Sequence, residues 1–136
     1  MDLTFKYQNH VIKYKIMTIN IELLTKTLEA VKANPEHWNQ EKWHCGTSHC
    51  FAGFVELIAN DLPLDSHSEE LRNDERFHKV FDPAYRFLIR WKTPDNSKRL
   101  LGLSEEESST LFHPCNTLSD LEHIVKSLVK KYSKFN

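Results

Sequence analysis

Helix start signals are the feature that most constrains how this chain can fold. In a capping box, a Ser or Thr side chain binds the backbone N–H three residues later, and the side chain at that later position reaches back. Three pairs have this spacing: Ser66 with Glu69, Ser104 with Glu107, and Thr117 with Asp120. A chain with repeated helix starts of this kind is expected to be mostly helical.

Other signals divide the chain into short helices. Asn20 is a good N-cap and Pro35 stops a helix, so the first helix is predicted to lie between them. A second helix is expected to begin near Thr47 or Ser48 and to end before Pro63. Further helices are predicted over residues 67–80, 83–90, 94–101, 105–112 and 118–132. From these seven candidate segments we expect five or six short helices that form a compact all-α bundle.

The N-terminal segment has a different pattern. Leu3, Phe5 and Tyr7 alternate with polar residues, which is the period of a β-strand, and the alternation returns from Ile12 to Ile16. Residues 1–16 are therefore predicted to be an N-terminal extension or a β-hairpin, and residues 17–136 a single helical domain.

Size and charge narrow the class of protein. The chain has 136 residues, 40% of them hydrophobic, and a net charge of −1, so it matches one ordinary globular domain. A balanced charge does not favour nucleic acid or a membrane surface as partner, and the acidic start of the predicted 105–112 helix would repel DNA. Three cysteines, no signal peptide and no apolar run of about 20 residues indicate a cytoplasmic protein.

One segment, residues 43–53, concentrates chemically versatile side chains. It contains two cysteines, two histidines and two of the three glycines, in the pattern W-x-C-G-T-x-x-C-x-A-G. Together with other short motifs, the pattern resembles a family of small uncharacterised bacterial and phage proteins, over roughly residues 18–130 without 62–95. The matching pieces are Asn34-Pro35-Glu36, Trp38, Trp43, Cys45-Gly46-Thr47, Cys50, Ala52-Gly53, Leu101-Gly102-Leu103-Ser104, Leu111-Phe112 and Asn116-Thr117-Leu118. The resemblance implies a shared fold and carries no activity.

Two chemical hypotheses apply to this segment. In the first, His44, Cys45, His49 and Cys50 are the ligands of a zinc ion, which prefers thiolate and imidazole groups. In the second, Cys45 is a reactive thiol, because a position just before a helix start lowers a thiol pKa and a neighbouring histidine can act as base. A Cys45–Cys50 redox pair is a variant of this idea, although its spacing exceeds that of the C-x-x-C motif.

A third, structural interpretation is the one that we favour. Gly46 permits a positive φ angle on entry to the second helix, Thr47 or Ser48 caps that helix, and both cysteines act as small buried hydrophobes. Trp38 and Trp43 would then cover the helix start.

The sequence therefore favours a non-catalytic protein-interaction module without a cofactor. Capped amphipathic helices account for nearly all informative residues, and no convergent polar cluster is recognisable. The partner is expected to be a protein, which includes a second copy of the chain in a homo-oligomer. The alternative is a zinc-binding or thiol-dependent protein centred on Cys45 and Cys50.

Overall fold

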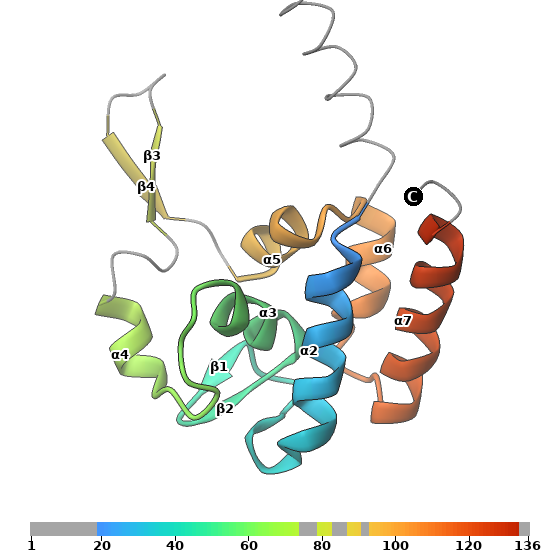
Figure 1. Ribbon diagram of the computed structural model, residues 1–136. Helices are drawn as coiled ribbons and strands as arrows, with labels where there is room; N and C mark the ends of the chain where they lie inside the picture. The colour runs from blue at the N-terminus through green and yellow to red at the C-terminus, as the bar shows by residue number, and fades with distance from the viewer. Residues whose placement is uncertain (1–18, 74–78, 83–86, 91–92, 134–136) are drawn as a thin grey trace, which may run out of the picture.

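The computed structural model describes residues 19–73, 79–82, 87–90 and 93–133. In chain order the elements are α2 (Ile21–Ala33), the 3-10 turn η1 (Pro35–His37), β1 (His44–Cys45), β2 (Ser48–His49), α3 (Phe51–Ala59), α4 (Ser68–Asn73), β3 (Lys79–Asp82), β4 (Phe87–Arg90), α5 (Thr93–Leu101), α6 (Glu105–Leu111) and α7 (Leu118–Tyr132). The mostly helical fold is confirmed (Figure 1). The predicted N-terminal hairpin lies outside the described residues.

Local capping sets several helix boundaries where it was predicted to do so. The predicted capping box of Ser66 and Glu69 is wrong, because the Ser66 hydroxyl donates to the Pro63 carbonyl and the Glu69 N–H donates to Nδ1 of His67. Asn20 accepts a hydrogen bond from the Leu23 N–H at 3.0 Å and thereby starts α2. At the starts of α6 and α7, both reciprocal bonds of the capping box are present, with Ser104 and Thr117 as caps. α5 ends where Gly102 takes a φ of 74°, a left-handed conformation in which glycine carries no Cβ penalty.

The core forms around α3, which packs between α2 and α5, while α7 packs against α2 and α6 (Figure 1). α3 contributes the fully buried side chains of Phe51, Phe54 and Leu57. Burial of a side chain of this size stabilises a fold by about 1.5–3 kcal/mol. The other helices contribute the buried side chains of Leu24, Leu28, Val31, Leu101, Leu111, Leu121, Val125 and Leu128. No helix in the described ranges has both the length and the apolar character needed to cross a membrane.

The segment between α3 and α5 differs from the prediction. Of the helix predicted over residues 67–80, the described part contains α4, and residues 79–80 belong to strand β3 instead. The helix predicted to reach Arg90 is wrong, because residues 87–90 are strand β4. β4 pairs antiparallel with β3, with Lys79 opposite Arg90 and Asp82 opposite Phe87. Aromatic and β-branched residues in both runs favour strands, and the Asp82-Pro83 pair suits the end of a strand as well as the start of a helix.

The start of α3 is also later than predicted. Residues 44–49 form a two-stranded hairpin, so that α3 begins at Phe51 with Cys50 as its cap, rather than near Thr47 or Ser48. Gly46 does adopt a positive φ, of 59°, but it does so in the turn of this hairpin.

Candidate functional site

The hairpin β1–β2 brings two histidines together. His44 lies directly opposite His49, and Cys45 directly opposite Ser48. Side chains of directly opposed residues lie on the same face of a β-ladder, and the next pair lies on the other face. The two imidazoles therefore share one face of the hairpin and Cys45 belongs to the other. His49 and Phe54 of α3 also meet edge to face.

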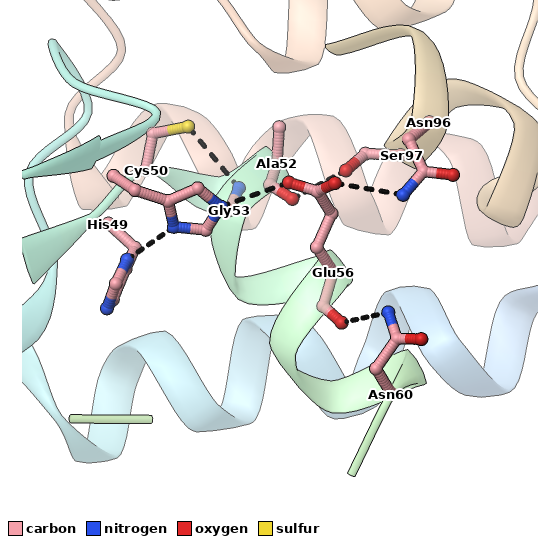
Figure 2. Close-up of polar contacts among 9 residues, drawn as sticks. His49, Cys50, Ala52, Gly53, Glu56, Asn60, Asn96 and Ser97 are labelled. Carbon is pink, nitrogen blue, oxygen red and sulfur yellow. Dashed lines mark hydrogen bonds and ion pairs between the residues drawn. The ribbon is translucent and has the colours of Figure 1, made fainter. Parts of the chain in front are cut away.

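The paired histidines begin a chain of buried hydrogen bonds that reaches α5. Nδ1 of His44 lies 2.5 Å from Nδ1 of His49, and Nε2 of His44 lies 3.0 Å from Oε1 of Glu56. Asn96 donates from Nδ2 to the other carboxylate oxygen of Glu56 at 2.9 Å. Figure 2 shows this arrangement, with Glu56 between the hairpin and α5. We call His49, His44, Glu56 and Asn96 the polar chain.

The polar chain is almost completely removed from solvent. The side chain of Glu56 is 0% exposed and that of His44 is 9% exposed, and His49 is likewise 0% exposed. A buried carboxylate without partners would strongly destabilise the fold. Both oxygens of Glu56 instead accept hydrogen bonds. A further hydrogen bond, from the Ser97 hydroxyl to the Ala52 carbonyl at 2.6 Å, also joins α5 to α3.

The polar chain has two hydrogen-bonded forms, which differ in the histidine that carries the proton between the two Nδ1 atoms. Burial and, second, the neighbouring His44 lower the pKa of His49 to about 4, so His49 is neutral near pH 7. His44 donates from Nε2 to the carboxylate, and one further proton lies between the two Nδ1 atoms. Either His49 donates it to a neutral His44, or a cationic His44 donates it to His49.

The far ring nitrogen of His49, Nε2, lacks a hydrogen bond of normal geometry within the part of the protein that the structure describes. The Ser66 backbone raises the pKa of His49, whereas burial lowers it. Nε2 is nevertheless buried without a hydrogen bond of normal geometry to any described residue. Such orphaned atoms are rare in folded proteins because each sacrifices its hydration. The polar chain thus ends at an imidazole nitrogen with unused hydrogen-bonding capacity.

Gly53 permits the hairpin to approach α3. A Cβ atom at this position would lie 2.2 Å from the Trp43 carbonyl oxygen and 3.0 Å from both the Cε1 of His44 and the Cβ of His49. Every side chain other than hydrogen would push the hairpin away from the helix. The glycine in the A-G part of the motif is therefore required by the histidine pair.

The cysteines have separate environments. Cys50 is buried and its sulfur accepts a hydrogen bond from the Gly53 N–H at 3.4 Å, which caps α3. Burial raises the pKa of this thiol to about 12. Cys45 and Cys115 are exposed. The prediction of a buried small residue is confirmed for Cys50 and wrong for Cys45, because residue 45 points away from α3 in the hairpin.

Of the four predicted zinc ligands, the structure brings His44 and His49 together, and their Nδ1 atoms face each other. Cys45 is on the opposite face of the hairpin and Cys50 caps α3. Among the residues that the structure describes, no group of three or more His, Cys, Asp or Glu side chains is arranged to hold a metal ion. Glu56 is not among the residues predicted for the site, although it is a single charge within the apolar run 51–59, which is a visible signal.

A surface hollow adjoins the polar chain through Trp43. Trp43 is 44% exposed, and no other large hydrophobic side chain among the described residues is classed as exposed. It forms part of the wall of a cavity of about 290 Å³. The other lining residues are Pro94, Asp95, Lys98, Glu105, Ser108, Ser109, Phe112, His113 and Pro114. We call this cavity the Trp43 hollow.

Comparisons of the chain with protein-family models, with curated proteins and with solved structures found no match. The fold and the site therefore define the class by themselves: a mostly helical domain in which a short hairpin is joined to two helices by a buried polar chain, with an exposed tryptophan at its edge.

Proposed function

We propose that this domain is a non-catalytic protein-interaction module that binds its partner at the Trp43 hollow. The observation that carries the proposal is the exposed indole of Trp43 beside a concave surface formed by Pro94, Phe112 and Pro114. Tryptophan is enriched among the residues that dominate binding energies at protein interfaces. A cavity of this size accommodates one or two side chains of a partner.

The interior of the site supports a binding role over a catalytic one. The polar chain and the Cys50 cap lie inside the fold and connect its elements, so their chemistry is directed to other parts of the same chain. A catalytic group must instead reach a substrate within hydrogen-bonding distance.

Charge indicates the chemistry of the partner. Asp95 lines the hollow and has no ion-pair partner among the described residues, whereas Lys98 is paired with Glu105. With Glu105, the lining carries two carboxylates against one lysine, so its charge is on balance negative. The occupant that fits this surface is a polypeptide segment with an apolar side chain next to a Lys or Arg.

The test uses a short peptide with one leucine flanked by lysines, and a second peptide with glutamates in their place. We expect the basic peptide to bind more tightly and to shift the backbone amide NMR signals of Asp95, Lys98 and His113. Trp43→Ala should weaken binding by about 2 kcal/mol, roughly 30-fold. Lys126→Ala, on an exposed part of α7, should leave the affinity unchanged.

Two results would contradict the proposal. One is the absence of binding by either peptide. The other is binding that Trp43→Ala leaves intact, since the partner surface would then lie elsewhere.

A further inference from the structure

We propose that the polar chain is a proton-operated latch that holds Trp43 in place, so that acidification releases the hairpin and weakens binding at the Trp43 hollow. The inference rests on the proposed function, and it specifies how the same site is regulated.

The first step concerns which elements the latch connects. His44 and His49 belong to the hairpin, Glu56 to α3 and Asn96 to α5. The walls of the Trp43 hollow include Trp43, which precedes β1, and residues 94, 95 and 98 of α5. The hydrogen bonds of the polar chain therefore set the separation of two walls of the hollow.

The second step concerns how β1 is held. The Trp43 carbonyl packs over Gly53 and accepts a long hydrogen bond of 3.4 Å from the Cys50 N–H. β2 has a firmer backbone contact, because the Asn39 N–H donates to the His49 carbonyl at 2.8 Å. The buried anchor of β1 is the side chain of His44, next in sequence to Trp43. Loss of the His44 contacts would free the tryptophan side of the hairpin first.

The third step is the proton count. The hydrogen bond between the two Nδ1 atoms needs one donor and one acceptor. Both hydrogen-bonded forms of the polar chain provide them. When both imidazoles carry a full set of protons, each Nδ1 is a donor and the bond is lost. Two cations would then face each other at van der Waals distance or less, in a site with little water.

The surroundings of His49 include charged and titratable groups from several elements. His44 of β1 and His37 of η1 both disfavour its protonation, and Glu56 of α3 reaches it only through His44. In α5, Arg99 donates a hydrogen bond to Asn96 at 2.7 Å, at the end of the polar chain that lies farthest from His49. Cys50, the cap of α3, is protonated and uncharged at neutral pH, since burial raises its pKa to about 12.

The experiment follows the free protein and the peptide complex between about pH 7 and pH 4, a range that covers the titration of a buried histidine. Imidazole ¹⁵N NMR reports the protonation of the His44–His49 pair, and the indole N–H signal of Trp43 reports the hairpin. We expect both signals to change with one midpoint, while far-UV circular dichroism stays constant. The affinity for the leucine–lysine peptide should fall about tenfold over the same range.

Two variants separate the latch from other titrating groups. His113 lines the hollow itself, so His113→Gln should keep the pH dependence if the latch causes it. His49→Gln, which takes up no proton, should remove that dependence. The wild-type NMR titration tests the latch even where the His49 variant does not fold.

The latch is refuted if the Trp43 signal does not move when both imidazoles of the pair are protonated, if the imidazole and indole signals change only with global loss of helix, or if His113→Gln abolishes the pH dependence. If the peptide fails to bind near pH 7, the proposed function fails, while the indole signal of the free protein still decides whether the hairpin is released.

Discussion

Glu56 shows how one residue organises this fold. It is a carboxylate on the otherwise apolar helix α3, and it is buried because His44 and Asn96 donate to its two oxygens. Removal of a partner leaves a buried charged group without a hydrogen bond. The resulting loss of folding free energy is larger than the net contribution of the hydrogen bond itself. The sequence signals this residue by its isolation in an apolar run, but its two partners lie 12 and 40 positions away.

The three thiols are expected to differ sharply in reactivity. Cys45 and Cys115 are exposed, whereas Cys50 is buried and its pKa is raised to about 12, so almost none of it is thiolate near pH 8. Titration with a thiol reagent should label two cysteines in the native protein and the third only after unfolding. Cys45→Ser and Cys115→Ser should each remove one fast-reacting thiol. Rapid labelling of Cys50 in the folded protein would contradict this account.

At the scale of elements, the hairpin and α3 are joined by a close backbone approach. The Trp43 carbonyl lies where a Cβ of residue 53 would stand, and the histidine pair flanks it. Short strands of two residues each have little stability of their own. The hairpin therefore depends for its position on contacts with the rest of the fold, among them this close approach and the polar chain.

Gly53→Ala should accordingly destabilise the protein by about 1–3 kcal/mol, the usual effect of overpacking, because backbone must move to admit the methyl group. Chemical denaturation measures the change in the free energy of unfolding, and the ¹⁵N signals of His44 and His49 should shift with it. Gly46→Ala is the matched control. It meets no atom within 4 Å, so its cost arises only from the φ of 59°, about 1–2 kcal/mol, and it should leave the imidazole signals in place. Equal imidazole shifts in both variants would argue against the close contact as the cause.

At the scale of the molecule, two polar clusters among the described residues join separate elements of the fold. The polar chain joins the hairpin, α3 and α5, and Glu107 joins α6 to α7 through Tyr132 at 2.6 Å and Lys131 at 3.2 Å. Partial burial raises the pKa of Glu107, but hydrogen bonds from the Ser104 backbone, Tyr132 and Lys131 outweigh it, and its pKa is lowered. Both clusters weaken in acid, because each depends on a deprotonated group.

Stability should therefore fall as the pH is lowered. The folded-state pKa of His49, about 4, lies below the 6.5 of an unperturbed imidazole, so the unfolded chain takes up the proton first. The contribution of neutral His49 is complete above pH 6.5 and is lost as the pH falls towards 4. From the shift, this amounts to about 3 kcal/mol of unfolding free energy. Urea denaturation at both ends of the range measures it, and His49→Gln should reduce the difference, unlike the exposed His123→Gln. An equal pH dependence in both variants would exclude His49 as its source.

Local sequence determined where most helices begin and end, because a cap, a proline or a glycine acts within one turn of the backbone. Asn20, Ser104, Thr117 and Gly102 perform the roles that their positions predict. Tertiary structure decided the rest: β3 pairs with β4, and Glu56 is buried only because the hairpin and α5 bring donors to it. These arrangements depend on contacts between separate segments, and the spacing of residues along the chain does not specify which segments meet.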